Sequence, residues 1–114
     1  MGTINNAFVL GHLGADPTMR TTDGGTPVTE ISIATNRRRD VDGETTFETT
    51  WHKVKLWATR AELANAHLKK GDAVAVGGRI NTEEWVDSEG KPRKRTVIVG
   101  QQLTLLGGSK RVAA

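Results

Sequence analysis

Apolar and polar residues alternate in several short segments of the chain, which is typical of half-buried β-strands. In the segment VTEISIATN, for example, Ile31 and Ile33 share one face while Ser32 lies between them on the other. Turn residues separate the segments, with Gly14 to Pro17 after the first and Asp87 to Gly90 before the last. The strands expected from this pattern are residues 6–13, 28–36, 49–57, 73–85 and 95–101. Residues 37–46 are polar, and we expect a loop or a flared hairpin tip there.

One short helix is expected between the third and fourth strands, roughly from Arg60 to Lys70. Thr59 with Glu62 three residues later fits a capping box, in which the two side chains satisfy free N–H groups at the helix start. Gly71 follows at the place of a left-handed C-terminal cap. The pattern therefore predicts a helix that is closed at both ends by local residues.

The order of these elements is strand, strand, strand, helix, strand, strand. This order is that of a five-stranded Greek-key barrel of the oligonucleotide-binding (OB) type, an all-β fold with one short helix. We expect one domain from residue 1 to 106, and a flexible C-terminal end from 107 to 114 because these residues are small and polar. Gly77-Gly78 predicts a bulge or bend, beyond which the face of Trp85 depends on the strand register.

The third strand ends in WHKVKLW, where an unusual set of side chains shares one face. Successive side chains of a strand point to opposite faces, so two tryptophans lie with two lysines, while valine and leucine face the core. The shared face carries Trp51, Lys53, Lys55 and Trp57. The two rings lie roughly 20 Å apart at about 3.3 Å per residue. This face suits a single-stranded nucleic acid, with bases stacked on the indoles and phosphates near the lysines.

An alternative places both indoles in a dimer interface or beneath a loop, with the lysine stems passing alongside. The aromatic content argues for the binding surface, because three of the five aromatic residues are tryptophan and no tyrosine occurs. The third, Trp85, follows a segment that carries Arg79. Large exposed aromatic side chains usually mark a binding site.

The charge distribution is consistent with a polyanionic partner. The net charge is only +3, but lysine and arginine occur in clusters. Solvated turns and strand ends are the alternative explanation for any single cluster. The candidate phosphate-binding residues are Arg37, Arg38, Arg39, Lys53, Lys55, Lys70, Arg79, Arg93 and Arg95.

Several function classes are disfavoured. Absence of cysteine excludes disulfides, thiolate zinc sites and cysteine nucleophiles. His12 and Asp16 flank a turn instead of sharing a helical face, and no metalloprotease, phosphate-loop or nucleophile-elbow motif occurs. We therefore expect no enzyme, no metal and no cofactor. No apolar stretch has the length of a membrane span or a signal peptide, so a cytoplasmic location is the simplest expectation.

Rivals from other classes remain open at this point. An RNA-binding OB domain or a replication-restart accessory protein would use the same stacking mechanism, and the 2′-hydroxyl contacts that separate RNA from DNA leave no motif. A structural oligomerisation module is a third possibility. Quenching of tryptophan fluorescence by poly-dT separates this module from the nucleic-acid binders.

A set of motifs along the chain resembles the bacterial single-stranded DNA-binding protein (SSB) family over nearly its whole length. The matching residues are Gly11 to Pro17, Arg20, Gly24-Gly25, Ala34 to Asn36, Thr50 to Val54, Ala61-Glu62, Leu68 to Asp72, Val76 to Arg79, Trp85 and Gly90. Each motif is weak alone. In this order and with this spacing they are specific.

The resemblance implies a non-enzymatic protein that coats single-stranded DNA in replication, recombination and repair, in the bacterial cytoplasm with the nucleoid. It implies base stacking on Trp51, Trp57 and Trp85. It also implies a homo-oligomer, most often a tetramer, that uses the first strand as an interface. The implied subunit-interface residues are Asn6, Phe8 and His52.

The chain departs from the family pattern in three places. Many members carry an aromatic residue near Arg39, where this chain has three consecutive arginines, which can both stack and bind phosphate. Glu83 and Glu84 precede Trp85 where the family is often basic, so phosphate contacts along this hairpin depend on residues 91–95. The family usually continues into a linker and an acidic tip that recruits other replication and repair proteins. Such a tip is either missing from this sequence, which stops at Ala114, or absent from this member.

Overall fold

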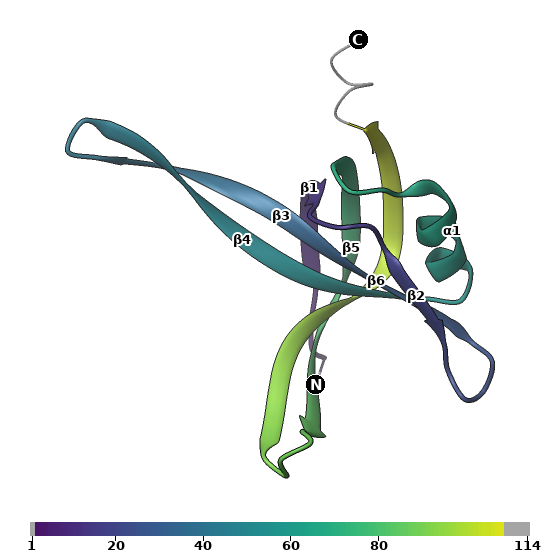
Figure 1. Ribbon diagram of the computed structural model, residues 1–114. Helices are drawn as coiled ribbons and strands as arrows, with labels where there is room; N and C mark the ends of the chain where they lie inside the picture. The colour runs from purple at the N-terminus through teal and green to yellow at the C-terminus, as the bar shows by residue number, and fades with distance from the viewer. Residues whose placement is uncertain (1, 109–114) are drawn as a thin grey trace.

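The alternating segments form long strands in the computed structural model, which describes residues 2–108 (Figure 1). The all-β expectation with one short helix is confirmed. In chain order the elements are β1 (Ala7–Leu13), β2 (Thr18–Thr21), β3 (Pro27–Val41), β4 (Glu44–Trp57), α1 (Thr59–His67), β5 (Asp72–Val86) and β6 (Pro92–Gly108). Strand β2 was not predicted, because four exposed residues show no burial pattern.

Five of the strands close into a barrel in the order β1-β5-β6-β4-β3, and a β1–β3 pairing completes the circle. β4 and β6 run parallel, whereas the other neighbours are antiparallel. Closure brings β1 close to β3 at Gly11, where a Cβ atom would lie 2.1 Å from the carbonyl oxygen of Ala34. A residue without a side chain is therefore required at this crossing. Strand β2 pairs with β3 outside the closed circle.

The barrel interior is filled by one face of each strand together with the helix. Helix α1 buries Ala61 and Ala64 against it, and the Thr29 hydroxyl donates a 2.8 Å hydrogen bond to the carbonyl oxygen of Ala61. The buried aliphatic side chains pack closely against one another in the barrel interior. The buried core residues are Leu13, Ile31, Ile33, Val54, Leu56, Ala61, Ala64, Leu68, Val74, Val76 and Ile98.

The start of the helix differs from the prediction. The N-cap residue is Ala58, with φ 55°, and no side chain caps the helix, so the Thr59–Glu62 capping box is wrong. The reason is tertiary. The backbone N–H of Ala58 donates to the carbonyl oxygen of Pro27 at 2.9 Å, so the chain turns sharply at this residue as it leaves β4.

The helix also ends earlier than expected, at His67 instead of Lys70. The N–H of Leu68 still donates to the carbonyl oxygen of Ala64, and the three N–H groups after it bond to acceptors outside the helix, at 3.0, 2.8 and 2.9 Å. The donors are Lys69, Lys70 and Gly71, and their acceptors are the Asp72 carboxylate, the Asp16 carboxylate and the carbonyl oxygen of Leu13. Gly71 does have the expected positive φ, at 92°, but in the turn after the helix.

Two hairpins extend from the barrel (Figure 1). Of the two alternatives predicted for the polar segment 37–46, the loop is wrong and the hairpin is confirmed, because β3 and β4 stay paired as far as Val41 and Glu44, with the turn at Asp42-Gly43. We call residues 36–49 the arm. The second hairpin, β5–β6, turns at residues 87–90 as predicted. These extensions explain a radius of gyration of 16.2 Å, against about 13 Å for a compact domain of this length.

The predicted irregularity at Gly77-Gly78 is confirmed as a shift of register between β5 and β6. The C-terminal expectation is wrong at its beginning, because Gly107 and Gly108 still pair with β5. Residues 109–114 of that segment lie outside the described residues. Within residues 2–108, no helix has the length and apolar character needed to cross a membrane.

Candidate nucleic-acid interface

Strand β4 places its two tryptophans on the outside of the barrel, as predicted. Trp51 is 56% exposed and Trp57 is 40% exposed, while Val54 and Leu56 are fully buried on the other side. The prediction that the indoles face away from the core is therefore confirmed. We call the outer side of β4 that carries Trp51, Lys53, Lys55 and Trp57 the indole face.

The strands beside β4 extend this surface sideways. The register aligns three rows across β4, β3 and β2, since residues directly opposite one another share a face. The rows are Trp57–Val28–Arg20, Lys55–Glu30–Thr18 and Lys53–Ser32. A hollow of about 310 Å³ lies over the β2 and β3 ends of these rows and reaches Lys53 on β4. Its lining residues are Ala15, Asp16, Thr18, Arg20, Val28, Glu30, Ser32 and Lys53.

Trp51 lies on the backbone of the turn that follows β1. A Cβ atom on Gly14 would lie 2.2 Å from Cζ3 and 2.6 Å from Cη2 of the Trp51 ring, so only glycine leaves space for the indole here. The N–H of Gly14 donates to the carbonyl oxygen of Ser32 at 3.1 Å, which holds this turn against β3. Trp51 thus packs on the backbone at Gly14 and remains open to solvent elsewhere.

Trp85 reaches the same surface from the β5–β6 hairpin. The extra residue at the register shift, Gln101, lies on β6, so the odd-numbered residues of β5 keep facing the outer side of β4, where Glu83 contacts Lys55. Trp85 is 45% exposed and lines a second hollow of about 590 Å³. The residues around this hollow are Arg20, Lys55, Glu83, Glu84, Trp85 and Arg95. Trp51 and Trp57 lie on the outer side of β4 with Lys55, which lines this hollow together with Trp85, so the three tryptophans share one side of the barrel. Arg20 lines both hollows.

Four charged residues on four strands form an ion cluster at the centre of this surface. Arg95 binds both carboxylate oxygens of Glu30, at 2.9 and 3.0 Å, and its Nε donates to Glu83 at 3.0 Å. Lys55 pairs with the same Glu83. We call Glu30, Lys55, Glu83 and Arg95 the ion cluster. Because its members come from β3, β4, β5 and β6, the cluster fastens the β5–β6 hairpin across the indole face.

The cluster shifts the pKa values of its members. The hydrogen bond from Arg95 lowers the pKa of Glu30, and that from Lys55 followed by Arg95 lowers the pKa of Glu83. The hydrogen bond with Glu30 raises the pKa of Arg95. These carboxylates are therefore charged at neutral pH, and the two positive charges are balanced within the protein. The guanidinium of Arg95 also lies 6.0 Å from the ring centroid of Trp85, a cation–π distance that helps to place this ring.

The sequence predicted Lys55 and Arg95 as phosphate-binding residues, but in the structure both are engaged in ion pairs with carboxylates of the protein. The side chain of Lys55 is only 11% exposed, and Arg95 uses its guanidinium on two carboxylates. Lys53, two residues from Lys55, is exposed and donates to the neutral hydroxyl of Ser32 at 2.8 Å. The two lysines share a face but not an environment, which alternation along one strand does not reveal.

Arg20 is the basic residue of this surface that sequence reasoning did not include. It is exposed on β2 opposite Val28, between the two hollows. Within residues 2–108, neither Arg20 nor Lys53 takes part in an ion pair. Arg20 belonged to the family motif quoted above, but its strand was not predicted, so nothing assigned it to a face.

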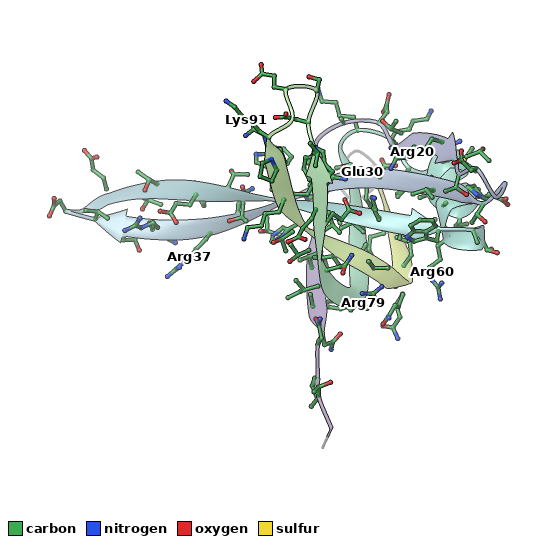
Figure 2. The ribbon with its side chains drawn as sticks, turned by 90° about the horizontal axis from the view of Figure 1, so that it is seen from below. Arg20, Glu30, Arg37, Arg60, Arg79 and Lys91 are labelled. Atoms are coloured by element: carbon green, nitrogen blue, oxygen red, sulfur yellow. The ribbon has the colours of Figure 1, made fainter. Side chains whose placement is uncertain are left out.

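The other arginines that were predicted to bind phosphate lie on the arm and at the tip of the β5–β6 hairpin. The alternation of β3 puts Arg38 on the indole-face side of the arm, whereas Arg37 and Arg39 lie on the other side, where Arg39 pairs with Glu48. At the tip of the β5–β6 hairpin Arg93 is paired with Asp87 at 2.9 Å. Figure 2 shows Arg37 out on the arm and Lys91 at the hairpin tip, both away from Glu30 on the barrel.

Arg79 and Lys70 lie at the margins of the surface. Arg79 is exposed directly after the bulge and shares the parity of Trp85, six residues further along β5. Lys70 is exposed in the turn after the helix, and its N–H bonds to Asp16, which lines the first hollow.

The residues expected at a subunit interface lie on other surfaces. Phe8 is 67% exposed on β1, and Leu10, which was not predicted, is 56% exposed beside it. The phenyl ring of Phe8 packs beside Gly77. Asn6 is exposed just before β1, and His52, on the core side of β4, accepts or donates a 2.9 Å hydrogen bond with Thr35.

The comparisons with known proteins agree with this architecture. The model of the family described as "Single-strand binding protein family" matches residues 4–106. The chain is 38% identical over 106 residues to a single-stranded DNA-binding protein of Xylella fastidiosa strain Temecula1, covering 92% of this chain and 65% of that protein. It is 36% identical over 109 residues to single-stranded DNA-binding protein 1 of X. fastidiosa strain 9a5c, covering 94% and 80%. The chain thus spans about two thirds and four fifths of these relatives.

A solved structure shows the same fold. The Plasmodium falciparum SSB complex with ssDNA superimposes with a TM-score of 0.80 at 26% sequence identity, covering 94% of this chain and 96% of that one. The barrel, the helix between β4 and β5, and the family match over residues 4–106 point the same way. This chain belongs to the single-strand binding protein family.

Proposed function

We propose that this protein binds single-stranded DNA on the indole face, without strong sequence preference and without catalysing a reaction. The observation that carries the proposal is that all three tryptophans, 40 to 56% exposed, lie on one side of the barrel: Trp51 and Trp57 on β4 with Lys53, and Trp85 at a hollow that Arg20 also lines. Bases stack on the rings, and the two cations free of ion pairs meet the phosphates. The relatives are named for single-stranded DNA binding, and the solved neighbour is a complex with it.

In a cell, this binding would coat exposed strands during replication, recombination and repair, with the protein in the cytoplasm at the nucleoid. The protein would act as a homo-oligomer, for which a tetramer is the family expectation. Support for association comes from β1, where Phe8 and Leu10 expose two large apolar side chains next to each other on one face. The edge of β1 from Ala7 to Leu10 that faces away from β5 has no strand partner within residues 2–108.

Fluorescence provides a direct test, because the chain has three tryptophans and all of them border the proposed surface. Titration with oligothymidylate should quench the emission strongly and saturate at a defined ratio of nucleotides to protein. Duplex DNA of the same length serves as the control, since its bases are already stacked. Emission that stays unchanged on adding oligothymidylate would contradict the proposal. A parallel titration with oligouridylate measures the preference for DNA over RNA.

A further inference from the structure

We propose that Phe47, on the arm, is a further base-stacking residue, and that Arg38 opposite it binds the phosphate beside that base. The inference rests on the proposed function, which it extends along the arm beyond Trp51. Phe47 is 68% exposed, the most exposed aromatic ring in residues 2–108. It lies outside the core, and nothing in the barrel requires it.

The register of the arm puts Phe47 on the same side as the indole face. Residues of β4 that differ by an even number share a side, so Phe47 and Thr49 continue the line that runs through Trp51 and Lys53. The two rings are four positions apart, which is roughly 13 Å along a strand. The step between the rings is therefore shorter than that between Trp51 and Trp57, and one continuous strand can span it.

Hydrogen bonds between side chains confirm which residues share this side. Thr49 donates to Asn36 at 2.7 Å, and Arg38 donates to Asp40 at 3.3 Å. Asn36 stands opposite Thr49 and Arg38 stands opposite Phe47 in the register. Ala34, Asn36 and Arg38 of β3 thus accompany the aromatic line of β4, and Arg37 and Arg39 do not.

The charges of the arm suggest where the contact begins and ends. Arg38 is 65% exposed in its pair with Asp40, which is 61% exposed. Such exposed pairs contribute little, so a phosphate can replace the carboxylate. The tip beyond carries Asp42 and Glu44, which repel a polyanion. The stacking platform therefore ends at Phe47 and does not continue to the turn.

The test uses the fact that the chain contains two phenylalanines, Phe8 and Phe47. Protein labelled with 4-fluorophenylalanine shows two fluorine resonances, which a Phe47→Leu variant assigns. On titration with oligothymidylates of increasing length, the Phe47 resonance should shift once the strand is long enough to pass Trp51. The Phe8 resonance, on β1, should move much less.

Affinity provides the second readout. Phe47→Ala should weaken binding of long oligothymidylate by roughly 5- to 150-fold per engaged protomer, the range expected for one stacked base. Val41→Ala is the matched control, because Val41 is an exposed apolar residue, 50% exposed, on the opposite side of the arm. Both side chains lie outside the core, so both variants should fold, which circular dichroism checks.

The outcomes separate this inference from the proposed function. If Phe47→Ala binds as well as the parent protein while Trp51→Ala binds more weakly, the inference is wrong and the indole face stands. If neither change affects binding, the proposed function fails as well. If Phe47→Ala alters the sedimentation coefficient of the free protein and leaves the affinity unchanged, the arm is a contact between subunits, and the inference is overturned.

Discussion

The open end of the indole face and its centre contain similar residues but have different properties. At the open end, Trp51 lies on Gly14 and Lys53 projects beside it into solvent. At the centre, two residues further along the same strand, Lys55 is enclosed by the β5–β6 hairpin and neutralised by Glu83. The comparison shows that the number of cations on a strand overstates the positive charge available to a ligand.

The centre uses its charges for structure. The ion cluster joins four strands, and its acidic members come from β3 and from the hairpin that holds Trp85. Glu83, which departs from the family pattern, does not leave an acidic patch in the surface, since Lys55 and Arg95 balance it. We therefore expect the open end to determine DNA affinity and the centre to determine stability and the position of the hairpin.

The largest effect should follow loss of a ring. Trp51→Ala and Trp57→Ala should each weaken binding of oligothymidylate by ~1–3 kcal/mol where the ring is engaged, because a stacking surface is removed. Isothermal titration or fluorescence anisotropy measures this loss. Stability should change little for Trp51, whose ring lies half in solvent. Full affinity in both variants would contradict the expectation that the exposed tryptophans determine DNA affinity.

Removing a member of the ion cluster should lower the free energy of unfolding. Arg95→Ala leaves Glu30 and Glu83 without their shared partner, and we expect a loss of about 1 kcal/mol, reduced from a buried-pair value because these side chains are partly exposed. Urea denaturation measures it. Lys94→Ala is the matched control, since Lys94 is exposed on the other side of the same strand and its removal should stay within about 0.5 kcal/mol. Equal losses in the two variants would mean that the cluster has no special role.

Low pH should weaken the ion cluster, because its two carboxylates become protonated. The pKa values of Glu30 and Glu83 are lowered from 4.5 in the folded protein, so the unfolded chain binds more protons in the interval below 4.5. The stabilisation is present above pH 4.5 and is lost as the pH falls through the lowered values. The urea midpoint should therefore decline as the pH falls below 4.5 and through the lowered pKa values.

Glu30→Gln should make this decline less steep, because one of the two titrating cluster members is gone. Asp87, whose pKa is lowered by the backbone N–H of Lys91 and then by Arg93, titrates in the parent and in the variant alike. It therefore cancels in the difference between them. The same steepness in both proteins would show that Glu30 gains nothing from Arg95.

The smallest effect distinguishes the two lysines. Lys53→Ala should reduce the slope of log affinity against log salt by about 0.7, the value for one phosphate contact on a single strand. Lys55→Met, which keeps the length of the side chain, should leave the slope unchanged. Binding isotherms at several salt concentrations provide both numbers. A reduced slope for Lys55→Met would show that DNA displaces Glu83 from this lysine.

Much of the fold was predictable because strand faces and turns are encoded locally. The alternation in WHKVKLW placed Trp51 and Trp57 outside and Val54 and Leu56 inside, as found. The turns at Asp42-Gly43 and at residues 87–90, and the irregularity at Gly77-Gly78, follow from the same local chemistry. The direction of a side chain depends on its own backbone, so a pattern of a few residues is enough.

What the sequence could not reveal depends on partners far away along the chain. The helix begins at Thr59, after the turn at Ala58, and ends at His67 because Pro27, Asp16 and Leu13 accept hydrogen bonds that a local pattern does not contain. Likewise Lys55 differs from Lys53 only because the folded hairpin brings Glu83 to one of them. The primary structure thus decides which residues face outward, and the tertiary structure decides which of their charges stay free, since ion pairing depends on distances in space.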